Sequence, residues 1–130
     1  MNLSHTRRLA GVSGSLLAAA AVLLGAFGAH ALRSVLDPDA LALWRTAVDY
    51  QFLHAFGLLF IALPSRPAAA AERLASMAFL CGILFFCGSL YCLALGAPRW
   101  TGILTPIGGA SFIVGWVAMA HALWPNVNKR

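Results

Sequence analysis

Residues 9–32 read LAGVSGSLLAAAAVLLGAFGAHAL, an apolar stretch that contains no charged side chain. An α-helix needs about 20 predominantly apolar residues to cross roughly 30 Å of hydrocarbon, so this stretch is long enough to span a membrane. Residues 74–98 and 100–128 are also free of charged side chains. The pattern therefore predicts a protein that folds in lipid.

The composition excludes a water-soluble domain. Of the 130 residues, 61% are hydrophobic and only 10% are charged, whereas a soluble domain is about half apolar and about a quarter charged. The net charge is +5, but the basic residues are isolated between apolar runs and form no stripe that could follow a phosphate backbone. We therefore expect a membrane protein with no nucleic-acid partner.

A fourth helix is indicated by its start signal. Asp37 is a favourable N-cap residue, Pro38 suits the first helical position, and Asp39 is an acid near the positive end of the helix dipole. The turn 64–67, sequence PSRP, should end this helix. We expect an all-α, integral membrane four-helix bundle, antiparallel with short loops, as a single transmembrane domain over 1–130. The expected helices are approximately 9–32, 38–63, 72–96 and 100–124.

The basic residues predict the orientation. Cytoplasmic loops carry an excess of Lys and Arg. One side of the predicted bundle has six basic residues and the other has Arg33, Arg45 and Arg99 only. Both termini should therefore be cytoplasmic. The first helix followed by Ala29-His30-Ala31 also resembles a signal peptide, but its apolar stretch is longer than usual for one, and we expect it to stay uncleaved.

Four motifs together resemble the YgdD/YwdK-like family of small membrane proteins, a domain-of-unknown-function family. The motifs are GAFGAHAL at 25–32, YQFLHA at 50–55, FCGSLY at 86–91 and GILTPIGG at 102–109. The resemblance covers essentially the whole chain. It implies an uncleaved, four-helix protein of the bacterial inner (cytoplasmic) membrane, and it implies no reaction, ligand or cofactor.

Polar residues from different helices are expected at one depth. At 1.5 Å per residue, Asp49, Ser89, Thr105 and Gly25 all lie about 21–24 Å from the cytoplasmic boundary. An ionised Asp at that depth is costly, so Asp49 should face the bundle interior, with Arg45 one turn away as its partner. The sequence therefore predicts an outer-leaflet polar cluster around Asp49. Its candidate binding residues are Asp49, His54, Gln51, Arg45, His30, Arg33, Ser89, Tyr91 and Thr105.

The polar residues have alternative explanations. Hydroxyl groups and small residues such as Ala21, Gly25 and Ala29 can serve only to pack helices together in lipid. His54 lies near the bilayer centre, where it could form a hydrogen bond between helices, relay protons or bind a ligand. Cys81, Cys87 and Cys92 have no metal-binding spacing and are expected to be small core residues.

We expect a non-enzymatic binding or structural accessory module, because no nucleophile–base pair, phosphate loop or metal site is present in the sequence. One alternative is a small transporter or channel subunit that acts as an oligomer. Another is a haem- or quinone-associated redox subunit, but His30 and His54 differ in height by about 18 Å on straight helices. No cofactor is expected. The expected partners are membrane lipid, further copies of the chain or a membrane complex.

Overall fold

The computed structural model describes residues 3–63 and 70–124, and every regular element in these ranges is helical. This confirms the all-α expectation. The elements are α1 (Leu3–His30), η1 (Leu32–Ser34), α2 (Pro38–Ala62), α3 (Ala70–Gly82), η2 (Ile83–Cys87), α4 (Gly88–Ala94), η3 (Arg99–Ile103) and α5 (Leu104–Leu123). The predicted turn at 64–67 lies outside the described residues.

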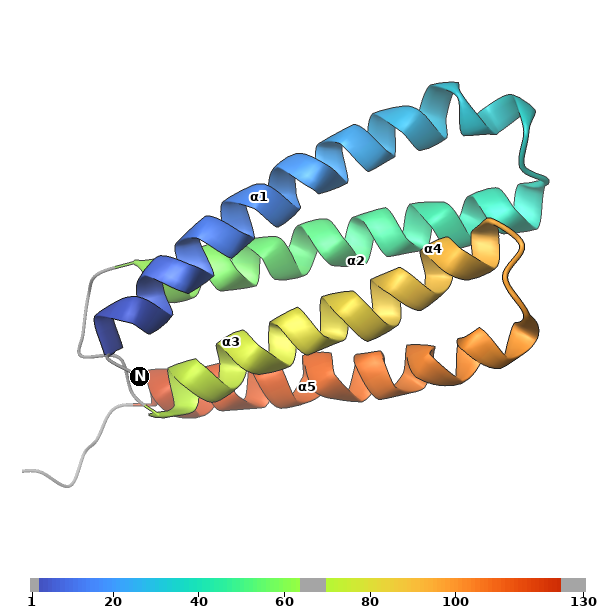
Figure 1. Ribbon diagram of the computed structural model, residues 1–130. Helices are drawn as coiled ribbons and strands as arrows, with labels where there is room; N and C mark the ends of the chain where they lie inside the picture. Colours follow the sequence, from blue (N-terminus) through green and yellow to red (C-terminus); the bar gives the residue numbers. More distant parts are fainter. Residues whose placement is uncertain (1–2, 64–69, 125–130) are drawn as a thin grey trace, which may run out of the picture.

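The helices pack mainly in two pairs. α1 lies along α2, and the continuous rod formed by α3, η2 and α4 lies along α5 (Figure 1). α2 joins the pairs, because it also contacts η2 and α4. The connection from α1 to α2 and the connection from α4 to α5 lie at the same end of the molecule. α2 is therefore the element whose side chains reach both pairs.

Three described segments are long and apolar enough to cross a membrane, namely His5–Ser34, Ala70–Ala94 and Arg99–Leu123. α2 has 25 residues, a length that would also cross the hydrocarbon core. It is less apolar because it contains Arg45, Asp49, Gln51 and His54. α2 thus differs from the three apolar segments in having charged and strongly polar side chains in its middle turns.

The start of α2 is as predicted. The Asp37 side chain accepts a hydrogen bond of 2.8 Å from the Ala40 backbone N–H, and Pro38 occupies the first helical position. The cap satisfies one of the backbone donors that every helix leaves unpaired at its N-terminus. α2 ends at Ala62, one residue before the predicted end.

Glycines of α5 allow this helix to approach α3 and η2 closely. A Cβ atom added to Gly115 would lie 2.6 Å from the ring of Phe79, which is fully buried. A Cβ atom on Gly108 would collide with the backbone of Phe86. Small residues at helix contacts are the usual means of close packing in lipid, where no hydrophobic effect drives helices together.

Two expectations for the third predicted helix need correction. The sequence predicts one uninterrupted helix over 72–96, but the structure contains a π-helical segment, Ile83–Cys87, and the helix ends at Ala94. The cysteines were all expected in the core, whereas Cys87 is buried and Cys81 and Cys92 are exposed. In lipid a small apolar thiol is tolerated on either face, so its presence does not indicate burial.

Candidate functional site

His54 is buried between α2, α3 and α5, and both of its ring nitrogens form hydrogen bonds. Nδ1 lies 2.7 Å from the Tyr50 carbonyl oxygen, and Nε2 lies 3.1 Å from the Trp116 indole nitrogen. A carbonyl oxygen can only accept, so Nδ1 carries the proton, and the Trp116 N–H donates to a bare Nε2. The ring also stacks on Phe112 at a centroid distance of 3.4 Å. The imidazole is therefore neutral and fully engaged by the protein.

Gln51 joins three helices through its side-chain amide. Its Nε2 donates to the Leu17 carbonyl oxygen of α1 (2.9 Å), and its Oε1 accepts from the Tyr91 hydroxyl of α4 (2.9 Å). The Tyr91 ring meets Trp44 edge-on at 4.7 Å, and the Trp44 indole donates to the Leu24 carbonyl oxygen of α1. These contacts hold α2 between α1 and α4.

Two further hydrogen bonds connect the rod formed by α3, η2 and α4 to α5. The hydroxyl groups of Ser89 and Thr105 lie 2.6 Å apart, and Ser89 also donates to the Phe86 carbonyl oxygen. Ser111 of α5 donates to the Ala78 carbonyl oxygen of α3. The interior polar side chains on α2, α4 and α5 are thus satisfied within the protein, as a chain in lipid requires.

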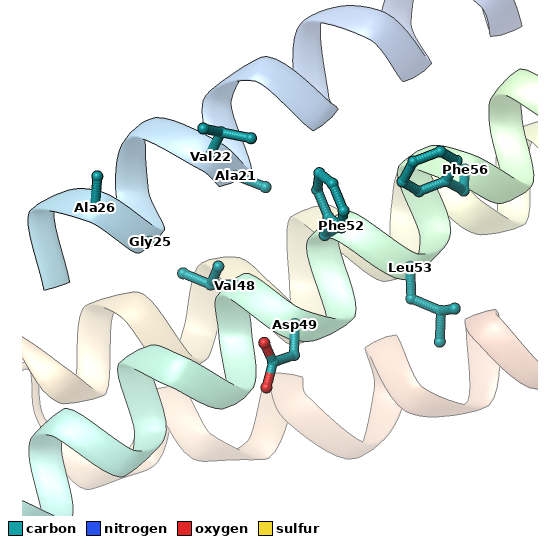
Figure 2. A pocket seen from close by; sticks show the side chains of 9 residues that line it. All are labelled: Ala21, Val22, Gly25, Ala26, Val48, Asp49, Phe52, Leu53 and Phe56. Carbon is teal, nitrogen blue, oxygen red and sulfur yellow. The ribbon is translucent and has the colours of Figure 1, made fainter. Parts of the chain in front are cut away.

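Asp49 lies on the outer surface, and the expectation that it faces the bundle interior is wrong. Its side chain is exposed and lines an open groove of about 440 Å³ between α1 and α2 (Figure 2). We call this the α1/α2 groove. It is lined by Ala21, Val22, Gly25 and Ala26 from α1 and by Val48, Asp49, Phe52, Leu53 and Phe56 from α2. The Asp49 carboxylate is the only charged group among these lining residues.

Arg45 borders the adjoining part of the same surface. A smaller hollow of about 200 Å³ is lined by Arg45, Asp49, Trp44 and the small residues of α1 around Gly28. Arg45 and Asp49 nevertheless do not form an ion pair. Among the described residues, the ion pair within 4.0 Å joins Arg7 and Glu72, at 3.4 Å. An acid and a base thus lie exposed one helical turn apart on α2.

The predicted cluster is therefore divided between two faces. Ser89 and Thr105 meet in the interior, as their predicted equal depth implies, and Gly25 and Asp49 meet on the outer face. Gln51 and Tyr91 form a second interior contact, and His54 is bonded elsewhere. His30 and Arg33 are exposed at the end of α1 and in η1, and neither lines the α1/α2 groove. Among the predicted site residues, Asp49 and Arg45 are the exposed ones that border the α1/α2 groove and the adjoining hollow.

The sequence reasoning missed Trp44 and Trp116. Each indole N–H finds its acceptor on another helix, at Leu24 and His54 respectively. The available signal was their position inside apolar helices, where an indole N–H requires an acceptor from the protein because lipid offers none. A second signal for Trp44 is Gly28, because a Cβ atom there would lie 2.6 Å from the Trp44 ring.

The histidine geometry does not fit a haem site. An axial histidine needs a ring nitrogen free to bind iron, and both nitrogens of His54 are bonded within the protein. His30 is exposed at the end of α1. Within residues 3–63 and 70–124, no three His, Cys, Asp or Glu side chains gather in a way that could hold a metal ion.

The comparisons with known proteins point to one family. The profile of the family described as "Protein of unknown function (DUF423)" matches residues 24–109. A UPF0382 membrane protein of Staphylococcus epidermidis is 43% identical over 111 residues, which are 85% of this chain and 91% of the relative. The UPF0382 membrane protein YwdK of Bacillus subtilis is 35% identical over 113 residues, covering 85% of this chain and 92% of YwdK.

A third relative is named for its location. The UPF0382 inner membrane protein YgdD of Escherichia coli is 38% identical over 99 residues, which are 75% of this chain and 76% of YgdD. No solved structure matches the chain. The resemblance to the YgdD/YwdK-like family is therefore confirmed by its two namesakes.

Proposed function

Since the chain belongs to the DUF423 family of membrane proteins of unknown function, we propose that it is a non-enzymatic, membrane-embedded binding module whose binding surface is the α1/α2 groove at Asp49. We propose further that it is a four-helix antiparallel bundle of the inner membrane with both termini cytoplasmic. The three apolar spans and the inner-membrane designation of the relative YgdD support this placement.

The observation that carries the proposal is the exposure of Asp49 in an apolar groove. An ionised carboxylate within the hydrocarbon core is costly, up to about 2.5–3.5 kcal/mol at the centre of a spanning helix on insertion scales. The described residues offer Asp49 no ion-pair partner, and the surrounding groove residues are apolar. A ligand or partner that presents a hydrogen-bond donor or a cation to this groove would offset the cost.

The interior geometry supports a binding surface more than a transport path. The polar side chains that could line a pore already form hydrogen bonds within the bundle. They are Gln51, His54, Tyr91, Ser89 and Thr105. A permeating ion would have to replace these bonds. The groove at Asp49 requires no such rearrangement, because it is open on the outer face.

Photocrosslinking in the host membrane tests the binding surface. Phe52 lines the groove, and replacing it with photoreactive benzoylphenylalanine should give a discrete adduct larger than a phospholipid adduct. The adduct should weaken in the Asp49→Asn background, because the carboxylate contributes to binding. The same photoreactive residue at Leu84, which is 66% exposed and lines neither part of this surface, is the matched control. Phospholipid adducts alone at both positions would refute the binding module.

A further inference from the structure

The outer face of α2 has the spacing of a helix-docking surface. Its exposed residues at 42, 46, 49, 53, 56 and 60 alternate in steps of four and three, which is the heptad spacing that keeps one seam facing a neighbouring helix. They are Ala42, Thr46, Asp49, Leu53, Phe56 and Phe60. The opposite face of α2, with Trp44, Gln51 and Leu58, is already buried against the rest of the bundle. A second helix could therefore pack along the outer seam without disturbing the interior.

The occupant must satisfy the charges on this seam. Asp49 is exposed in the groove, and Arg45 is exposed one turn away on the same side of α2. The face thus carries both members of an acid–base pair, and it is complementary to itself. Pairing within the helix is the weaker arrangement, because a base that precedes an acid by four residues is the less favourable order, and the structure does not pair them.

We propose that the α1/α2 groove binds a second copy of this chain in a parallel, two-fold symmetric dimer, with Arg45 of each copy paired to Asp49 of the other. Copies that insert with the same orientation are related by an axis along the membrane normal, so equal heights meet across the interface. Arg45 and Asp49 differ by about 6 Å along the helix, a span that an arginine side chain can bridge. The symmetry forms two such pairs. This inference rests on the proposed function, because it names the partner of the same groove.

Charge reversal distinguishes pairing between copies from pairing within one copy. Arg45→Glu places two acidic side chains on this face of α2, and Asp49→Lys places two basic side chains there. Neither variant should associate with itself, and the apparent dissociation constant should rise at least about tenfold. A mixture of the two variants should recover the wild-type affinity, because each heterodimer contains two opposite-charge pairs. Pairing within one helix cannot produce this recovery.

The measurement is energy transfer between donor- and acceptor-labelled full-length chains. The chains are reconstituted in vesicles of phosphatidylethanolamine and phosphatidylglycerol at decreasing protein-to-lipid ratios. The matched controls are Arg33→Glu and Asp39→Lys, which reverse exposed charges outside the groove and should leave association unchanged. If a charge-reversal variant fails to fold, Asp49→Asn and Arg45→Gln replace it, because they introduce no new charge. Each of these neutral variants should also weaken association.

The outcomes separate this inference from the proposed function. If both charge-reversal variants lose association and their mixture regains it, the result supports the dimer. A monomeric wild-type chain, or a mixture that does not recover, overturns the dimer. If the crosslink at Phe52 then still yields a different, Asp49-dependent protein, the binding module stands with another occupant. If that crosslink yields lipid alone, the proposed function itself fails.

Discussion

At the scale of single residues, His54 illustrates how the surroundings of a polar group determine its role. From the sequence it could be a proton relay, a ligand-binding group or a structural residue. Its proton lies on Nδ1 because the neighbour is a carbonyl, and its Nε2 is occupied by the indole of Trp116. The structural explanation follows from these two contacts. Sequence reasoning could locate His54 in the membrane, but it could not identify a partner 62 residues away.

Trp116→Phe should destabilise the protein through this contact. The change removes the N–H donor and leaves the buried Nε2 of His54 without a partner. Hydrogen bonds between membrane helices contribute about 0.6 kcal/mol on average and at most about 1.7 kcal/mol. The free energy of unfolding in mixed micelles should therefore decrease by an amount in that range. Trp124→Phe is the control, because Trp124 is 75% exposed. Equal losses in the two variants would contradict the assigned role of Trp116.

At the scale of an element, the π segment Ile83–Cys87 allows one rod to satisfy two sets of contacts. Ala78, before the segment, accepts from Ser111, and Ser89, after it, meets Thr105. A π turn contains one residue more than the α-helical turn it replaces, so it adjusts the rotation of the two flanking segments relative to each other. The sequence predicted an uninterrupted helix because no proline or other breaker lies in this segment.

Deleting Leu84 should therefore be tolerated. The deletion removes the extra residue, so the π turn can become α-helical while both flanking segments keep their faces toward α5. Deleting Val114 from the regular helix α5 should instead rotate Gly115, Ala118 and Met119 by about 100° away from the interface. Circular dichroism and unfolding in mixed micelles should give a folded Leu84 deletion and a misfolded Val114 deletion. The reverse result would exclude this function for the π turn.

At the scale of the whole molecule, the charges predict how the protein lies in the membrane. By their order along the chain, six of the nine Lys and Arg residues fall on the side of the predicted bundle that is expected to hold both termini, and this excess predicts that side to be cytoplasmic. Lys129, Arg130 and Arg66 lie outside the described residues, so this prediction depends on their order along the chain. All copies would then insert with the same orientation, so the outer seam of α2 lies at the same height in each copy, as the parallel dimer requires.

Reporter fusions test this orientation. Green fluorescent protein fused after Arg130 should fluoresce, and alkaline phosphatase at the same position should be inactive, because the former matures in the cytoplasm and the latter in the periplasm. Fusions after Leu36, in the connection between α1 and α2, should give the opposite pair of results. An active phosphatase after Arg130 would place the C-terminus outside and contradict the predicted orientation.

Sequence patterns alone were enough to predict the helical class, the apolar spans, the start of α2 at Asp37 and the equal depth of Ser89 and Thr105. These properties depend on local composition and on distance along a helix. The packing of the helices was needed to learn that Asp49 faces outward, that His54 meets Trp116 and that Gln51 bridges α1 to α4. The physical reason is that helices in lipid are apolar on both their packed and their exposed faces, so hydrophobic periodicity does not reveal which face is buried. The rotation of each helix is fixed by packing against residues distant in the chain.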